Sequence, residues 1–171
     1  MVILRATKRL LRIWPTPSGG TASSDTALGD WYVNRLVVDR QPLLILVSAR
    51  SLLSLLVPAR DVRGLPARLS VLVADRLRRL GVPERVAKAE SAAMNPVVIA
   101  GTQDRSILGT MVDFARMIPG YLPIGGWDQT TLPFVESRLA ETPCRASGRV
   151  EEVIFPERAA PDLLAARWHA A

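Results

Sequence analysis

The sequence is poor in the residues that carry most enzyme chemistry. It contains one histidine, His169, and one cysteine, Cys144, in 171 residues. A single thiol excludes an intrachain disulfide and any zinc site built from several thiolates. A Cys–His nucleophile is not favoured either, because Cys144 has no histidine near it in the sequence. The sequence therefore predicts no metal site and no cofactor, and the cytoplasm is the expected compartment.

Long hydrophobic runs are also missing. The longest apolar stretch, residues 42–47, has the length of one buried strand, far below the roughly 20 residues that a membrane-spanning helix needs. The first residues, MVILRATKRLLRIW, have charges scattered among apolar ones, which breaks the uninterrupted apolar region of a secretory signal. We therefore expect no association with a membrane.

Lysine is rare, so nearly all the positive charge comes from arginine. Lys8 and Lys88 are the only lysines, and Lys plus Arg number 22 against 16 Asp plus Glu, a net charge of +6. Such a bias is typical of a GC-rich genome. It is also expected of a surface that binds anions, because arginine pairs with phosphate through two parallel hydrogen bonds. Composition alone leaves both interpretations open.

What the sequence does contain is a strong hydrophobic pattern, which predicts one α+β domain. Apolar segments indicate five strands, at residues 2–4, 31–39, 43–47, 51–57 and 97–100. The segment 43–47 is apolar on both faces, as in a central strand, and 51–57 could instead be a short buried helix. Apolar spacings of three and four predict helices at 65–80, 83–94 and 106–118. We expect a small, mostly antiparallel sheet packed on one face by about three helices.

The pattern weakens towards the C-terminus. We expect a single domain over residues 1–133 and a C-terminal extension, 134–171, that packs on the domain or mediates contacts. Within the domain, residues 14–30 are rich in Pro, Gly, Ser and Thr and predict a long loop. The PTPSGGT segment in this loop lacks the lysine and the spacing of a phosphate-binding P-loop.

Two short segments are candidates for holding an anion. Arg50 lies in a turn between two apolar strands, where it is either a surface residue or an anion ligand at the end of the sheet. Asp104, Arg105 and Ser106 begin a predicted helix, whose free N–H groups favour anions. Asp104 or Ser106 could equally serve only as the N-cap of that helix.

A basic helix is the third candidate. Arg76, Arg78 and Arg79 crowd the end of the helix at 65–80, and we expect all three on its outer face. Such a face could be merely solvated, or it could contact the phosphates of a nucleic acid. The sequence shows neither the aromatic pattern of an RNA-recognition sheet nor a helix-turn-helix pair.

Several segments together resemble a bacterial family of small proteins of unknown function. They are VILRATKRLL, LGDWYVNRL, ARSLLSLLVPAR and RSILGTMVDFA, which span roughly residues 2–118, and the ETPC of residues 141–144 fits the same pattern. Asp104 stands where the pattern has Asn. The resemblance implies a shared domain, with residues 14–30 and 145–171 as its variable parts, and it implies no activity.

The sequence thus leaves three hypotheses. The first is a non-enzymatic binding module whose Arg-rich face contacts nucleic acid or an acidic protein partner. The second is an enzyme that acts on a phosphorylated or nucleotide substrate near Arg50, Asp104 and Arg105, with catalytic residues unknown. The third is a structural homo-oligomer built through an exposed strand or the C-terminal tail.

Overall fold

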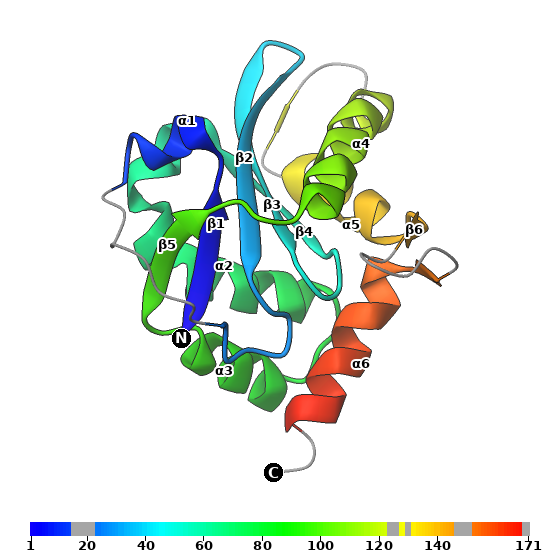
Figure 1. The fold of residues 1–171 in the computed structure, drawn as a ribbon. Coiled ribbons are helices and arrows are strands. Elements are labelled where there is room, and N and C mark those ends of the chain that lie inside the picture. The colour runs from blue at the N-terminus through cyan, green and yellow to red at the C-terminus, as the bar shows by residue number, and fades with distance from the viewer. Residues whose placement is uncertain (15–22, 123–126, 129–130, 146–151, 169–171) are drawn as a thin grey trace.

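Five strands form one twisted sheet at the centre of the molecule (Figure 1). The computed structural model describes residues 1–14, 23–122, 127–128, 131–145 and 152–168. The strands are β1 (Val2–Ala6), β2 (Trp31–Val38), β3 (Gln41–Ser48), β4 (Ser54–Pro58) and β5 (Val97–Gly101), and they lie in the order β4-β3-β2-β1-β5. The five predicted strands are confirmed, and residues 54–57 of the segment left open between strand and helix belong to the strand β4.

Helices connect and cover these strands. They are α1 (Lys8–Leu11), the 3-10 helix η1 (Ala59–Gly64), α2 (Leu65–Arg79), α3 (Glu84–Ala93), α4 (Arg105–Tyr121), α5 (Thr131–Ala140) and α6 (Pro156–Trp168). A small hairpin, β6 (Cys144–Arg145) with β7 (Val153–Ile154), stands apart from the main sheet. The three predicted helices are therefore present. None of the helices in the described residues combines the length and apolar character that crossing a membrane requires.

The sheet is mixed, and the expectation of a mostly antiparallel sheet is wrong. β1 pairs in parallel with β2, with Leu4 opposite Trp31, and with β5, with Val2 opposite Val97. The pairs β2–β3 and β3–β4 are antiparallel. Through its two antiparallel pairings β4 runs parallel to β2, so β4 and β5 run in the same direction. The crossover between these two edge strands contains η1, α2 and α3, as a connection between parallel strands requires.

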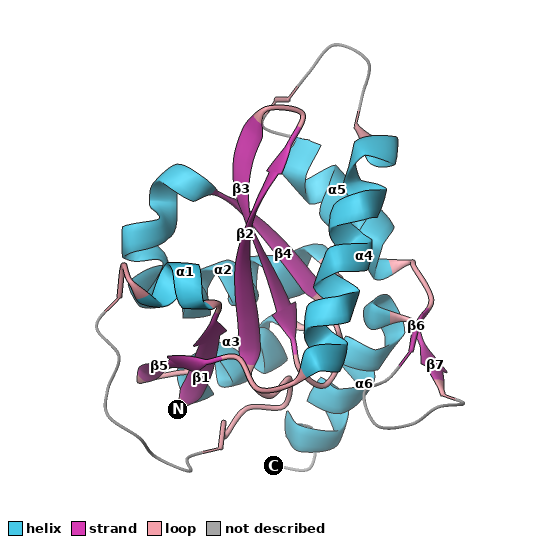
Figure 2. Cartoon of the chain, turned by 45° about the horizontal axis from the view of Figure 1, so that its top comes forward, coloured by secondary structure: helices cyan, strands magenta, loops and turns pink. Residues whose placement is uncertain are grey.

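Helices pack on both faces of the sheet, so the expected one-sided packing is also wrong (Figure 2). Successive residues of β3 point to opposite faces: Leu44 and Leu46 pack in the core with α2 and α3, while Ile45 and Val47 pack in the core with α4 and α5. A strand buried on both faces needs apolar residues at every position. The apolar run predicted as a central strand is indeed the interior strand β3.

The C-terminal helices complete both cores. Val135 and Leu139 of α5 are fully buried in the core beneath α4, and Ala160 and Leu164 of α6 are fully buried in the core beneath α2 and α3. The extension thus packs on the rest of the chain, while its separation from the domain at residue 133 stays a prediction. Two boundary predictions are wrong by three residues, since β4 begins at Ser54 and α4 continues through Pro119 to Tyr121.

Candidate functional site

The arginines at the end of α2 lie in three different environments. Arg76 is 2% exposed; its Nε donates to the backbone oxygen of Ser54 at 3.3 Å and its Nη2 to that of Glu136 at 3.0 Å. Arg78 is exposed and pairs with Asp75 at 2.6 Å and Glu84 at 2.7 Å. The expectation that Arg76 lies on the outer face is therefore wrong, because α5 packs beside this side of α2 and β4.

Glu136 of α5 receives the remaining contacts of this cluster. Its Oε1 accepts the N–H of Leu56 at 2.8 Å, and its Oε2 lies 2.6 Å from Arg79 Nη2 and 3.7 Å from Arg76 Nε. Burial raises the pKa of Glu136, while the Leu56 N–H and the two guanidinium groups oppose that rise. Since Leu56 lies on the edge strand β4, this buried ion cluster closes one edge of the sheet.

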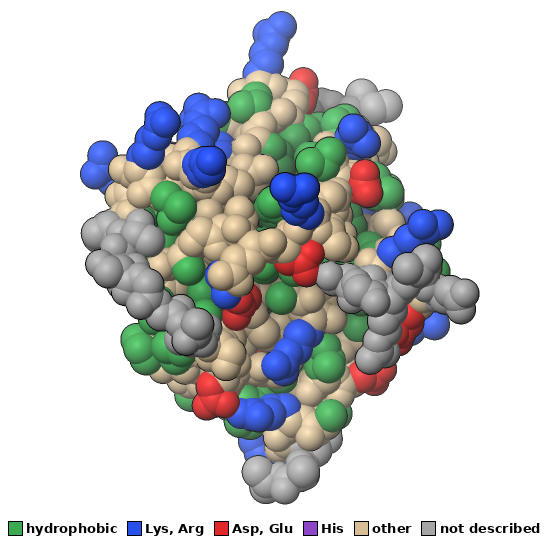
Figure 3. Space-filling view, viewed as in Figure 1, with side chains coloured by type: hydrophobic (Ala, Val, Ile, Leu, Met, Phe, Trp, Pro, Cys, Tyr) green, Lys and Arg blue, Asp and Glu red, His purple; other side chains and the backbone are tan. Residues whose placement is uncertain are grey.

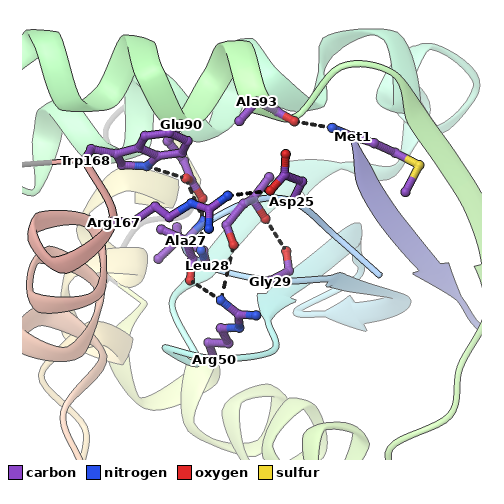
Figure 4. Close-up of polar contacts among 11 residues, drawn as sticks. Met1, Asp25, Ala27, Leu28, Gly29, Arg50, Glu90, Ala93, Arg167 and Trp168 are labelled. Carbon is purple, nitrogen blue, oxygen red and sulfur yellow. Dashed lines mark hydrogen bonds and ion pairs between the residues drawn. The ribbon is translucent and has the colours of Figure 1, made fainter. Parts of the chain in front are cut away.

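Arg50 lies at the turn between β3 and β4 and holds the segment that precedes β2 (Figure 4). Its Nη1 donates to the carbonyl oxygens of Thr26 at 3.4 Å and Ala27 at 3.5 Å. A Cβ on Gly29 would come within 3.1 Å of Arg50 Cγ, so the stem of the arginine covers that glycine. These contacts give Arg50 a structural role, and its anion-binding role stays a prediction.

Glu90 of α3 fixes the same segment from the opposite side, and the sequence reasoning missed it. The carboxylate is fully buried and accepts the N–H groups of Ala27 at 2.9 Å and Leu28 at 3.0 Å and the indole N–H of Trp168 at 2.8 Å (Figure 4). Glu90 shares its helix face with the buried Val86 and Ala87. An acid at a core position of an amphipathic helix is the signal that could have identified it.

A buried ion pair links the carboxyl half of β1 to the start of β2, and it too was missed. Arg5 is 8% exposed; its Nε lies 2.5 Å from Asp30 Oδ2 and its Nη1 donates to the Gly101 carbonyl oxygen at 3.1 Å. Ser24 donates to the other oxygen of Asp30 at 2.5 Å. By sequence alone, an Asp just before a strand indicates an ordinary turn acceptor. The pair ties β1, β5 and the segment before β2 together.

Asp104 is the N-cap of α4, which is one of the two roles, capping or anion binding, that the sequence left open for it. Its Oδ1 accepts the N–H of Ser106 at 2.8 Å, and its own N–H donates to the hydroxyl of Tyr32 at 3.2 Å. Burial raises the pKa of Tyr32. Arg105 and Ser106 are exposed at the start of the helix.

The strands β1 and β5 are parallel neighbours, and the chain continues from their carboxyl ends to opposite faces of the sheet. After β1 it enters α1, whose Leu10 packs in the core with α2; after β5 it enters α4, which packs on the other face. In open α/β sheets, ligands bind at such a topological switch point. We call this region the switch-point end and define it by Lys8, Arg9, Arg12 and Arg105.

All four residues of the switch-point end are cationic and exposed. Figure 3 shows Lys and Arg side chains gathered over α1. Over the ranges that the structure covers, none of the four forms an ion pair, in contrast to Arg76, Arg78 and Arg79. The structure thus distinguishes the neutralised arginines at the end of α2 from the unneutralised cations of the switch-point end. Other exposed arginines have no ion pair within the described residues either: Arg40, Arg60, Arg63 and Arg85.

The remaining groups singled out by the sequence are the cysteine and the histidine. Burial, together with the nearby charge of Asp113, raises the pKa of the free Cys144 thiol to about 11, which leaves it protonated at neutral pH. His169 lies outside the described residues. No group of three or more His, Cys, Asp or Glu within those residues could hold a metal ion.

Comparison with known proteins gives one match. A family model described as a domain of unknown function (DUF6933) matches residues 3–159. Neither the curated proteins nor the solved structures contain a match to the chain.

Proposed function

The chain belongs to the DUF6933 family of unknown function, and we propose from its own geometry that it is a binding module for the phosphate backbone of a nucleic acid. The contact surface is the switch-point end. The observation that carries this proposal is the group of exposed cations Lys8, Arg9, Arg12 and Arg105, which have no described carboxylate to neutralise them.

The arrangement of charge favours the switch-point end, rather than the end of α2, as the contact surface. A nucleic acid gains affinity when cations that are free in the protein neutralise its phosphates and release counterions. Arg78 and Arg79 would first have to leave Asp75, Glu84 and Glu136. The cations of α1 have no such partners to leave, and Arg105 is exposed at the first turn of α4.

The chemistry of the described residues favours binding over catalysis. The buried acids Glu90 and Glu136 and the partly buried Asp30 are already engaged with backbone N–H groups, with the arginines of α2 or with Arg5. A general acid or base needs a proton that it can exchange with a substrate within hydrogen-bond reach. Each of these acids instead holds elements of the fold together.

The experiment is fluorescence anisotropy of labelled single-stranded RNA and duplex DNA with nucleic-acid-free protein, from about 50 to 200 mM salt. We expect binding that weakens steeply with salt. The triple variant Lys8→Ala, Arg9→Ala, Arg12→Ala should reduce the slope of log affinity against log salt by about 2 to 3 for duplex DNA, since each phosphate contact contributes about 0.9.

The matched control is the triple variant Arg85→Ala, Lys88→Ala, Arg158→Ala, which removes the same charge from exposed positions on α3 and α6. This variant should keep most of the binding. Equal losses in the two variants, or no binding of wild type at low salt, would overturn the proposal. Equally tight binding of polyglutamate would overturn the nucleic-acid assignment in favour of an acidic protein partner.

A further inference from the structure

The outward side of α4, opposite the buried residues that pack on the sheet, has two exposed apolar side chains. Val112 is 45% exposed and Met117 is 37% exposed, and both lie among the exposed residues of this helix. Figure 3 shows hydrophobic side chains over α4 with acidic and basic ones among them. We call this side the outer face of α4 and define it by Gly109, Val112, Asp113, Arg116, Met117 and Gly120.

We propose that the outer face of α4 is the interface of a symmetric dimer, in which the α4 helices of two copies pack antiparallel. A two-fold axis requires the surface to be complementary to itself. With the axis between residues 114 and 115, position 109 meets 120, position 112 meets 117, and position 113 meets 116. Each of these pairings joins residues of compatible size or charge.

The charged pair provides the strongest argument for a second copy as the occupant. Asp113 and Arg116 lie 3.6 Å apart within one helix, with side chains 64% and 77% exposed, so their interaction within the monomer contributes little. In the antiparallel arrangement Asp113 faces the partner's Arg116, and the partner's Asp113 faces Arg116. The same two residues therefore form two complementary pairs across the axis.

The uncharged positions fit the same axis. Val112 meets the partner's Met117, which brings two exposed apolar side chains together. Gly109 meets the partner's Gly120, and a Cβ built on either glycine would have no atom within 4 Å in the monomer. The absence of side chains at these two positions lets the helices approach closely at both ends of the contact.

A groove beside the helix extends the contact. It has a volume of about 580 Å³, and its walls are α4, through residues that include Gly109, Asp113 and Met117, and the segment 142–145. A single helix pair buries less than the roughly 1,200–2,000 Å² of a typical stable interface. We therefore expect a weak dimer whose population depends on protein concentration. The switch-point cations of α1 lie outside this interface.

The test is sedimentation velocity of the nucleic-acid-free protein from about 10 µM to 1 mM. We expect the wild type to shift from monomer towards dimer over this range. Asp113→Arg and Arg116→Asp should each remain monomeric, because each places like charges across the axis. A mixture of these two variants should form a heterodimer, and the double variant Asp113→Arg, Arg116→Asp should dimerise like wild type.

A steric variant separates the interface from the fold. Gly109→Gln replaces a glycine by a better helix former in open space, so the monomer should stay folded while dimerisation is lost. A wild type that is monomeric at every concentration overturns the proposal. So does a dimer that survives in Asp113→Arg, Arg116→Asp and Gly109→Gln. Circular dichroism melting of each variant verifies that its monomer is folded.

Discussion

At the scale of single residues, the main finding is that several charged side chains are structural. The Arg76–Glu136 ion pair is almost completely buried, and the Arg5–Asp30 pair is largely buried. The sequence placed Arg76 at the surface because arginine is rarely buried without a partner. Its partner Glu136 is 60 positions away and becomes adjacent only when α5 packs beside β4. No local pattern in the sequence indicates that pairing.

The first prediction concerns this buried pair. Glu136→Ala removes the acceptor of the Leu56 N–H and leaves Arg76 buried without its carboxylate. Breaking a buried ion pair by removing one partner costs about 3–5 kcal/mol, so the free energy of unfolding in urea should fall by about that amount.

Its control is Glu141→Ala. Glu141 pairs with Arg138 at 2.8 Å, but this pair is exposed, with side chains 46% and 47% accessible, and such pairs contribute about 1 kcal/mol or less. Similar losses in the two variants would show that the cluster around Glu136 does not stabilise the fold.

At the scale of elements, local signals predicted most helices and strands correctly. Pro66 lies in the first turn of α2 and Gly81 follows its last turn, the positions in a helix that suit each residue. Gly81 has a φ of +84°, the left-handed conformation that ends many helices. Pro119 is the exception, because it lies in the last turn of α4 and the helix continues for two residues beyond it.

The second prediction compares two glycines of helices. Gly109 lies inside α4 and Gly81 follows α2, and a Cβ on either would meet no atom within 4 Å. The two positions therefore differ in their backbone conformation and not in the space around them. Gly109→Ala should raise the free energy of unfolding by about 0.5–1 kcal/mol, since alanine favours the helix. Gly81→Ala should lower it, since positive φ strains a residue with a Cβ.

Urea denaturation at low micromolar concentration measures both changes on the monomer. Two changes of the same sign would show that backbone conformation is not what distinguishes these positions. Gly64 is a further comparison, because a Cβ there would also meet open space and its backbone has ordinary helical dihedral angles.

At the scale of the whole molecule, contacts between residues far apart in the sequence hold the fold together. The segment before β2 is held by Glu90 of α3, by Arg50 at the β3–β4 turn and by an ion pair of Asp25 with Arg167 of α6 (Figure 4). The apolar residues of α5 and α6 fill both cores. The C-terminal segment is thus part of the packing that holds the segment before β2 in place.

The third prediction tests that dependence with two truncations. A chain that ends at residue 133 loses Glu136, the apolar side chains of α5 and those of α6. It should show no cooperative thermal unfolding, since both cores are left open. A chain that ends at residue 168 should unfold like the full protein. Cooperative unfolding of the shorter chain would instead identify residues 1–133 as an independent domain.

The sequence by itself determined the five strands of the main sheet, the helices α2, α3 and α4, and the poverty of catalytic and metal-ligating residues. These properties are local, because they depend on periodicity, on capping residues or on composition. The tertiary structure alone decided the parallel pairing of β5, the covering of both faces of the sheet, and whether each arginine is buried or exposed. Each of these depends on contacts between residues distant in the chain. An arginine such as Arg76 is buried because folding brings a carboxylate to it, whereas an arginine without such a partner stays at the surface.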